Sequence, residues 1–289
     1  MTKGFFLKLS RRLFKPYASM LKPYFRDIAK SLQKSNMGYT VEEYLSLALF
    51  LVTITFVVES VFLTMIFSII LQNALFALVL GLVLSIAVTC GLVFLFYIYP
   101  GTAAGNREKN IEKMLPFATA YLTAIASGNV QMSAMFETLS KFEKYGEIGI
   151  EAKTIARNID LFGMTAVESI RRVAERTPSE DLRDLLFGVN NILISGGNIM
   201  DYLDGQSNEL MASYRRAITK YAQNLSLFVE IYLTLLITGS VFFIVLSSVI
   251  AVISGGLGTV LLQTFVVFIL LPLISIAFIV LIKSMSPMD

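Results

Sequence analysis

Few residues of this chain belong to types that carry catalysis, and the missing ones restrict its chemistry. The 289 residues contain no His and one Cys, so the commonest general base and metal ligand is absent. The single thiol, Cys90, lies in an apolar run, where we expect it to pack in a membrane helix. It cannot form an internal disulfide or a Cys-based zinc site. We therefore expect no metal, no cofactor and no enzymatic activity.

Motifs that hold phosphate or cleave peptides are also missing. No G-x-x-x-x-G-K-[ST] loop occurs, so nucleotide phosphates cannot be held in that way. No G-x-G-D, a pattern known from one family of membrane aspartyl proteases, lies in or beside an apolar run, which argues against that activity. Gly105-Asn106-Arg107 lacks the context of a phosphate loop. A net charge of +3 gives no indication of nucleic acid as a partner.

One acidic residue, Glu59, lies in the middle of an apolar run, where an ionised side chain costs about 2–4 kcal/mol to insert. Three roles are open for Glu59. It could contact a partner helix, or it could be protonated and hydrogen-bonded to Thr55, Ser60 or a neighbouring helix. It could also line an ion pathway. Glu230 lies near the start of a later run, where a charge is cheaper to place.

Charged clusters occur at predicted helix ends in the middle of the chain. They are the basic set Arg171, Arg172 and Arg176 and the acidic set Glu180, Asp181 and Asp184. Such runs form solvated faces, or they dock a partner through electrostatic complementarity. A third group is predicted to bind lipid headgroups, namely Lys8, Arg11, Arg12, Lys15, Arg215, Arg216 and Lys220.

Four apolar runs are long enough to cross a hydrocarbon core of about 30 Å, which takes about 20 helical residues. The expected spans are 44–71, 74–99, 225–253 and 260–282, and the second is predicted to end at Pro100-Gly101. This divides the chain into a segment 1–39, a transmembrane hairpin 40–99, a polar domain 100–224 and a second hairpin 225–289. Gly239 and Pro272 are positions where the later spans could bend.

The positive charges predict the orientation of these spans. Residues 1–43 contain nine Lys or Arg against three acids, whereas the turns near 72–73 and 254–259 are uncharged. The positive-inside rule therefore places both termini and the middle domain in the cytoplasm, in a multi-pass protein of the cell membrane.

The N-terminal segment has apolar residues every three or four positions with basic residues between them. This pattern is typical of a basic amphipathic helix on the inner leaflet, which we expect to bend at Pro16 and Pro23. The alternative is a helix packed on the cytoplasmic domain.

Residues 100–224 show a helical spacing of apolar residues and no strand pattern. Three stripes should form the core, within 132–142, 148–162 and 182–193. T-x-x-E motifs predict helix starts at Thr40 and Thr165, and Thr177-Pro178-Ser179-Glu180 predicts another with Thr177 as the N-cap. Left-handed glycines should end helices at Gly128, Gly163 and Gly196-Gly197.

The predicted fold is therefore an all-α membrane protein. It contains a cytoplasmic antiparallel bundle of about six helices, with two transmembrane helices before the bundle in the chain and two after it. The last helix of the bundle, from Asn198, should run directly into the third span, because no helix-breaking residue lies between Gln206 and Glu230.

Several short sequences resemble the type II secretion system F-type domain. They are Ile111-Glu112-Lys113-Met114-Leu115-Pro116-Phe117 followed by Ser127-Gly128, then Tyr145-Gly146-Glu147-Ile148, Arg176-Thr177-Pro178-Ser179, and Ser195-Gly196-Gly197-Asn198 with Tyr202-Leu203. The last three are similar to archaeal members, the membrane platform proteins of the archaellum and of type IV pilus-like filaments. The resemblance covers roughly residues 98–250.

The resemblance implies a platform that docks a hexameric secretion ATPase while pilin-like filament subunits assemble around it. A single domain flanked by two spans on each side is similar to the short platform proteins of Tad-type pili, which work in pairs. This arrangement favours pilus or adhesion-filament assembly, with a second copy or a paralogous platform protein as partner. A transporter or ion-conducting protein that uses Glu59 is the alternative.

Overall fold

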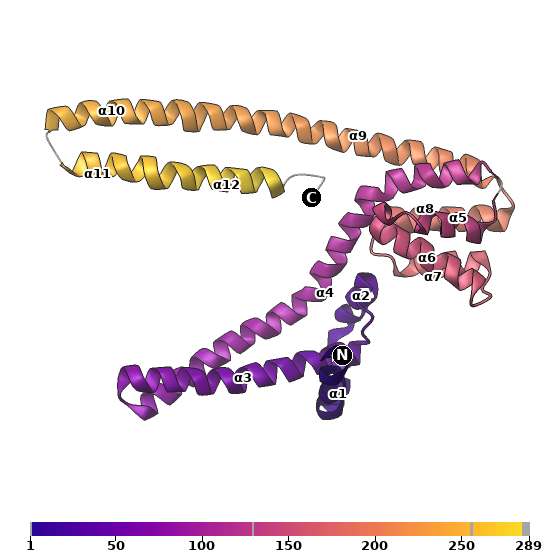
Figure 1. Ribbon diagram of the computed structural model, residues 1–289, viewed down its shortest axis with the longest axis horizontal. Helices are drawn as coiled ribbons and strands as arrows, with labels where there is room; N and C mark the ends of the chain where they lie inside the picture. The colour runs from indigo at the N-terminus through magenta and orange to yellow at the C-terminus, as the bar shows by residue number, and fades with distance from the viewer. Residues whose placement is uncertain (1, 129, 255–256, 285–289) are drawn as a thin grey trace. The chain divides into compact units, whose positions relative to one another are not determined.

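The chain is helical almost throughout in its computed structural model, which describes residues 2–128, 130–254 and 257–284 (Figure 1). No strand occurs in these ranges, which confirms the all-α prediction. The helices are α1 Thr2–Leu21, η1 Lys22–Phe25, α2 Arg26–Ser35, α3 Val41–Leu71, α4 Ala74–Ala126, α5 Met132–Ser140, η2 Glu143–Tyr145, α6 Gly146–Asp160, α7 Ala166–Arg176, α8 Glu180–Ser195, α9 Ile199–Tyr232, η3 Leu233–Thr238, α10 Gly239–Ser254, α11 Leu257–Phe265, η4 Val266–Leu270 and α12 Leu271–Ser284.

Four helical stretches have the length and composition needed to cross a membrane: Val41–Leu71, Ala74–Ala126, Ile199–Ile253 and Val260–Lys283. The four predicted spans lie within them, so the chain is a multi-pass membrane protein. It divides into two compact units, Met1–Tyr202 and Leu203–Asp289.

The second span does not end at Pro100, as the sequence predicted, because α4 continues to Ala126. A proline inside a helix leaves the carbonyl four residues earlier without its N–H donor. Here that carbonyl belongs to Phe96, and Tyr44 Oη of α3 donates a hydrogen bond to it at 2.7 Å. The rings of Tyr44 and Phe96 also meet edge to face. Because the neighbouring helix satisfies the freed carbonyl, α4 passes from the span into the bundle as one helix.

The hairpin of α3 and α4 depends on a close approach at Gly81. A Cβ at this position would lie 2.7 Å from Thr64 Oγ1 and 3.0 Å from the Thr64 backbone nitrogen. Small residues allow this spacing between membrane helices. We expect Gly81→Ala to force the helices apart and to cost about 1–3 kcal/mol of stability, as overpacking does. Thermal unfolding of the full chain in detergent measures this loss. Gly91→Ala is the matched control, because a Cβ at Gly91 would meet no described atom within 4 Å. Equal melting temperatures for Gly81→Ala and Gly91→Ala would contradict the expectation.

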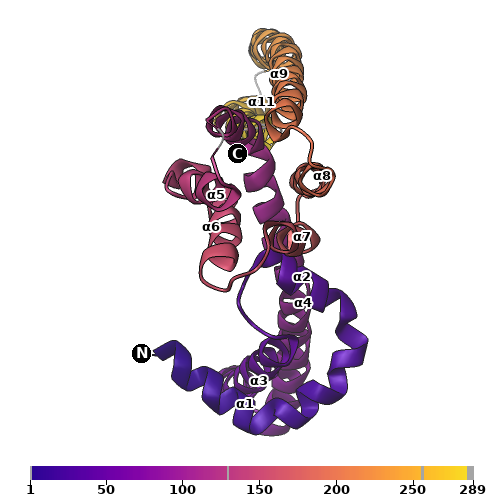
Figure 2. The same cartoon turned by 90° about the vertical axis from the view of Figure 1, so that its right-hand side faces the viewer.

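The helix of the N-terminal segment is interrupted at one of the two prolines where a bend was expected. The turn η1, which contains Pro23, separates α1 from α2, whereas Pro16 lies inside α1. Helix α1 crosses the first part of α3, and α2 packs on α4 (Figure 2). Ile28 and Leu32 of α2 are buried in a small cluster with Tyr44. The segment thus contacts its own chain, and its position on the membrane surface stays a prediction.

A helical bundle surrounds the last part of α4, with α5 and α6 on one side and α7 and α8 on the other (Figure 2). The predicted stripes supply its core, which includes Met135, Leu139, Ile155 and Val189. The ends of two stripes were predicted wrongly, because Phe142 is 47% exposed and Phe162 is 67% exposed. Both lie outside the helices, where the chain leaves the helical register.

The helix ends follow the predicted capping chemistry at most positions. Thr40 forms a complete capping box with Glu43, and Thr165 Oγ1 accepts from the Glu168 backbone N–H. Gly163 and Gly196 adopt left-handed φ values of 64° and 72°, whereas Gly128 does not.

One N-cap was predicted two residues too early. Thr177 ends α7, and Ser179 caps α8 by accepting from the Leu182 N–H. The ring of Pro178 favours an extended backbone at the residue before it, and Thr177 has that conformation, with φ −62° and ψ 141°.

The second unit is a helical hairpin in which α9, η3 and α10 are followed by α11, η4 and α12 (Figure 1). Tyr232 contacts Ser275 across it, and Gln263 donates to Ser248. Two π-helical segments interrupt the helices, η3 directly before Gly239 and η4 directly before Leu271-Pro272. π-Segments widen a helix locally, so they coincide with the positions where bending was expected.

Candidate functional site

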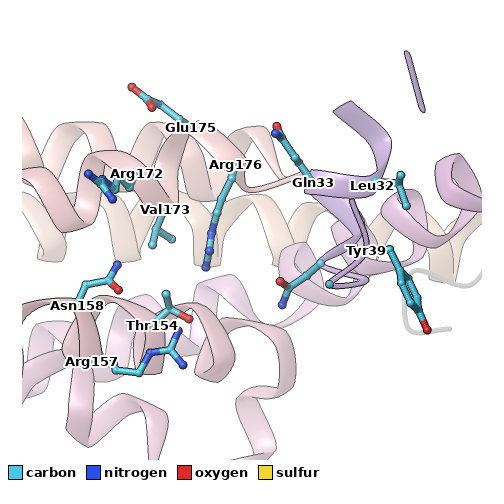
Figure 3. Close-up of a pocket in the computed structure, with 12 residues that line it drawn as sticks. Leu32, Gln33, Tyr39, Thr154, Arg157, Asn158, Arg172, Val173, Glu175 and Arg176 are labelled. Atoms are coloured by element: carbon cyan, nitrogen blue, oxygen red, sulfur yellow. The ribbon is translucent and has the colours of Figure 1, made fainter. Parts of the chain in front are cut away.

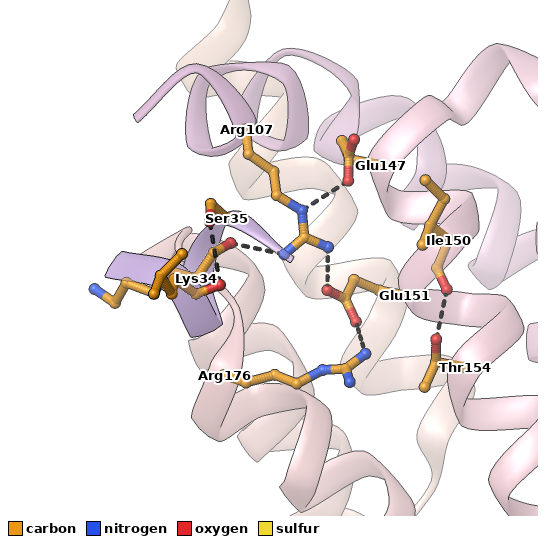
Figure 4. A network of polar contacts seen from close by, with 9 residues as sticks. Lys34, Ser35, Arg107, Glu147, Ile150, Glu151, Thr154 and Arg176 are labelled. Carbon is orange, nitrogen blue, oxygen red and sulfur yellow. Dashed lines mark hydrogen bonds and ion pairs between the residues drawn. The ribbon is translucent and has the colours of Figure 1, made fainter. Parts of the chain in front are cut away.

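The strongest polar feature of the bundle is a buried arginine, Arg107, on the part of α4 that follows the span (Figure 4). Its side chain is 5% exposed. Arg107 Nε donates to Glu147 Oε2 at 2.7 Å, and Nη2 donates to Glu151 Oε1 at 2.5 Å. Nη1 donates to the carbonyl of Lys34 at 2.8 Å. Arg107 therefore joins α4 to α6 and to the last turn of α2.

Glu151 extends this network to a fourth helix. Its side chain is 2% exposed, and Oε2 accepts a hydrogen bond at 2.7 Å from Arg176 at the end of α7 (Figure 4). A carboxylate this deeply buried is tolerated only when it is paired and hydrogen-bonded. Two guanidinium groups supply that pairing. We call Arg107, Glu147, Glu151 and Arg176 the buried ion network.

The network changes how the predicted basic cluster is interpreted. Arg176 holds Glu151, whereas Arg171 and Arg172 are exposed on α7. Arg171 pairs with Glu168 and Glu175, and Arg172 pairs with Glu168. These hydrogen bonds keep the pKa of Glu168 below its ordinary value. The exposed pair can contact a partner, which stays a prediction, while Arg176 has a structural role.

The acidic cluster lies at the start of α8. Glu180, Asp181 and Asp184 are exposed, and the first two stand in the first turn. There the positive end of the helix dipole favours acidic side chains. Burial raises the pKa of Glu112 on α4, and repulsion from Glu108, Asp181 and Glu180 raises it further. The acidic residues of α4 and α8 therefore form one negative patch, and its docking role is likewise untested.

An open cleft of about 590 Å³ adjoins the network, between α6, α7 and the link from α2 to α3 (Figure 3). Arg157 and Asn158 line it from α6, and Arg172 and Arg176 line it from α7. The opposite lip is the link that contains Tyr39. Three guanidinium groups thus share one concave surface.

Glu59 keeps an oxygen without a hydrogen bond. Its Oε2 atom is buried and has no partner within the described part of the chain. Ser60, one of the partners that the sequence suggested, donates instead to the Val57 carbonyl at 3.1 Å. Thr89 Oγ1 on α4 is also buried without a partner there. Glu230 is exposed on the last turn of α9.

The residues predicted to bind lipid headgroups are spread over α1 and α9. Arg11 pairs with Glu43, while Arg12 and Lys15 are exposed. The side chain of Lys8 lies outside the described residues. Arg215, Arg216 and Lys220 are exposed on α9. Across the described ranges, no group of three or more His, Cys, Asp or Glu side chains is arranged to hold a metal ion.

Sequence reasoning missed Arg107, although a signal was present. Ala104, Arg107, Ile111 and Leu115 are spaced three or four residues apart and are all buried on one face of α4. Glu151 lies in the same way within the apolar stripe of α6. Opposite charges on the apolar faces of two packed helices indicate a buried ion pair.

Comparison with known proteins gives one family. The model described as Type II secretion system (T2SS), protein F matches residues 118–247, from the last part of α4 to α10. An uncharacterized protein of Methanocaldococcus jannaschii is 27% identical over 135 residues, which is 47% of this chain and 23% of that protein. The Flagella accessory protein J of the same organism is 23% identical over 150 residues, 52% of this chain and 26% of that protein.

The matches therefore cover only part of this chain and only part of each relative. The aligned region covers about a quarter of the length of these two relatives. No solved structure matches the chain.

Proposed function

We propose that this chain, which carries a domain of the type II secretion system protein F family, is a membrane platform for assembling a type IV pilus-like or archaellum-like filament. The family match and the likeness to a flagella accessory protein support this role. One structural observation carries the argument further. The family domain is built on helices that continue from membrane spans, α4 at its start and α9 at its end.

The proposed mechanism uses these continuous helices. A hexameric cytoplasmic ATPase would dock on the bundle, and its nucleotide-driven movement would displace α4 and α9. Since α4 has no loop between its span and its bundle part, displacement of the bundle would move the membrane part directly. Filament subunits would then be admitted beside the spans. A second copy or a paralogous platform protein would complete the assembly.

The buried ion network supports this mechanism because a force carrier has to be stiff. It ties α2, α6 and α7 to α4 within a few residues of the span. Hydrogen bonds and ion pairs that join several helices in a buried network rigidify a core. Force applied to α7 would therefore reach α4 without a flexible joint.

The membrane orientation can be tested by cysteine labelling. After Cys90→Ala, single cysteines are placed at Lys141 and Leu161 in the bundle and at Gln72 between α3 and α4. We expect an impermeant maleimide added to intact cells to label Gln72→Cys alone, because positive charges retain the bundle inside. Inside-out vesicles should reverse the pattern. External labelling of either bundle position would contradict the platform role.

The docking partner can be tested by co-purification. A tagged full-length chain should retain the secretion-type ATPase of its own cell, and deletion of that ATPase should abolish filaments while the chain remains in the membrane. A chain that retains no such ATPase, in cells that still build filaments, would contradict the proposal.

A transporter is the second candidate, because Glu59 Oε2 is buried in a span without a partner among the residues that the structure describes. The two functions differ in one measurement. The platform predicts that vesicles containing the wild-type chain show no more ion flux than empty vesicles, and that Glu59→Gln changes nothing. A flux that Glu59→Gln removes would favour the transporter.

A further inference from the structure

The cleft between α6, α7 and the α2–α3 link has the chemistry of an anion site. Arg157 is exposed on α6 and makes no ion pair with any residue that the structure describes. Arg176 Nε is buried and lacks an acceptor within the same residues. Arg172 adds a third guanidinium from α7 (Figure 3). Guanidinium groups bind phosphate through paired N–H donors.

Neutral donors complete the lining, and its one carboxylate is neutralised. The side-chain amides of Asn158 and Gln33 line the cleft from opposite walls. Glu175 also lines it but pairs with Arg171 at 3.6 Å. An anion placed here would therefore meet the guanidinium of Arg157 and the two side-chain amides, with little repulsion.

The cleft also lies next to the start of the first candidate span. Its lip contains Gly38 and Tyr39, and α3 begins at Val41. The polar headgroup layer adds roughly 5–7 Å to each side of the hydrocarbon core, which matches the few residues between the lip and the start of the span. Tyr39 is 39% exposed, and tyrosine is enriched at this depth.

We propose that this cleft binds the phosphate group of an acidic lipid from the adjoining leaflet. The inference rests on membrane insertion and on the geometry of one unit, so it does not depend on the role in filament assembly. It differs from nonspecific attraction of the basic N-terminal segment, because the cleft offers fixed donors from α6 and α7 to a single headgroup.

Native mass spectrometry of the delipidated full-length protein in detergent tests the proposal. Phosphatidylglycerol and phosphatidylcholine are added separately, and inorganic phosphate is added as a competitor. We expect phosphatidylglycerol to bind at least tenfold more tightly than phosphatidylcholine. Arg157→Gln with Arg172→Gln should weaken phosphatidylglycerol binding at least tenfold, since two charge-assisted hydrogen bonds are lost.

The matched control is Lys109→Gln with Lys141→Gln. Both residues are exposed, and Lys141, like Arg172, pairs with a glutamate four residues away. The control should bind phosphatidylglycerol as the wild type does. Arg176 is left in place because it neutralises Glu151. Single Arg157→Gln, which breaks no ion pair within the described residues, keeps the test valid if the double variant unfolds.

Three outcomes would overturn the proposal. Equal weakening in the cleft variant and the control would show diffuse surface attraction. Full displacement of the lipid by an equal concentration of inorganic phosphate would assign the cleft to a soluble phosphate ligand. Equal binding of the two lipids by the wild type would remove the preference for an acidic headgroup.

Discussion

Replacement of Arg107 by methionine should lower the free energy of unfolding of the bundle by about 3–5 kcal/mol, the cost of breaking a buried ion pair from one side. Glu151 is 2% exposed and would keep only Arg176. The Lys34 carbonyl would also lose its donor. Heating the full chain in detergent while recording helix content should show a decrease in melting temperature of roughly 10–20 °C.

Two controls separate a lost charge pair from lost packing. Arg172→Met removes an exposed arginine with one ion pair, which is worth about 0–1 kcal/mol. Arg107→Met combined with Glu151→Leu removes both buried charges and should recover much of the lost stability, because apolar replacements of a buried pair are often neutral. If Arg107→Met alone has the melting temperature of the wild type, the network does not stabilise the bundle.

The same variant should release α2 from the bundle. Arg107 is bonded to the carbonyl of Lys34, in the last turn of α2. Hydrogen exchange of residues 26–35 should therefore accelerate in Arg107→Met at temperatures where α6 is still protected. If hydrogen exchange accelerates in α6 alone, the substitution does not act through the contact between Arg107 and α2.

The local sequence pattern was sufficient to predict most helices. It failed where a helix depends on a contact with a residue that is distant in the sequence. The apolar stripes predicted Met135, Leu139, Ile155 and Val189 as core, and they are buried. Such stripes need only the periodicity of one helix.

Pro100 shows the limit of local rules. It should end a helix, because its ring removes a hydrogen bond. The helix continues because Tyr44 donates a hydrogen bond to the freed carbonyl of Phe96, which lies 52 residues later in the chain. A rule that considers only a few neighbouring residues cannot predict this contact.

Arg107 shows the same limit for the site. Its pairing with Glu151 spans 44 residues, so inspection of neighbouring residues along the chain did not indicate a role for either of them. The cluster at Arg171, Arg172 and Arg176 was treated as one unit for the same reason. Burial of Glu151 separates Arg176 from the other two, and only the packing of α6 on α7 shows this.

Reversal of Arg171 and Arg172 to glutamate should reduce retention of the proposed ATPase at least tenfold and abolish filaments, while the chain remains in the membrane. Close charge pairs across an interface contribute about 1.5–7 kcal/mol of coupling, and reversal turns attraction into repulsion. Pull-down of the ATPase by the tagged chain measures retention, and electron microscopy of cells measures filaments.

The fold itself should tolerate this reversal. The new glutamates would face Glu168 and Glu175 at i,i+3 or i,i+4 spacing, and each like-charge pair costs about 0.2–0.5 kcal/mol. Arg176 has to remain, because its reversal would place a second negative charge beside buried Glu151. Lys141→Glu with Lys144→Glu, exposed in the same bundle, controls for net charge.

The outcome distinguishes two surfaces of the bundle. If the reversed α7 still retains the ATPase and the control does too, docking on Arg171 and Arg172 is excluded. Reversal of Glu180, Asp181 and Asp184 to lysine then tests the negative patch. If α7 is the docking helix, a charge-reversed acidic residue on the ATPase should restore retention, because complementarity depends on relative sign. The buried ion network connects α7 to α4, so restored docking should also restore filaments.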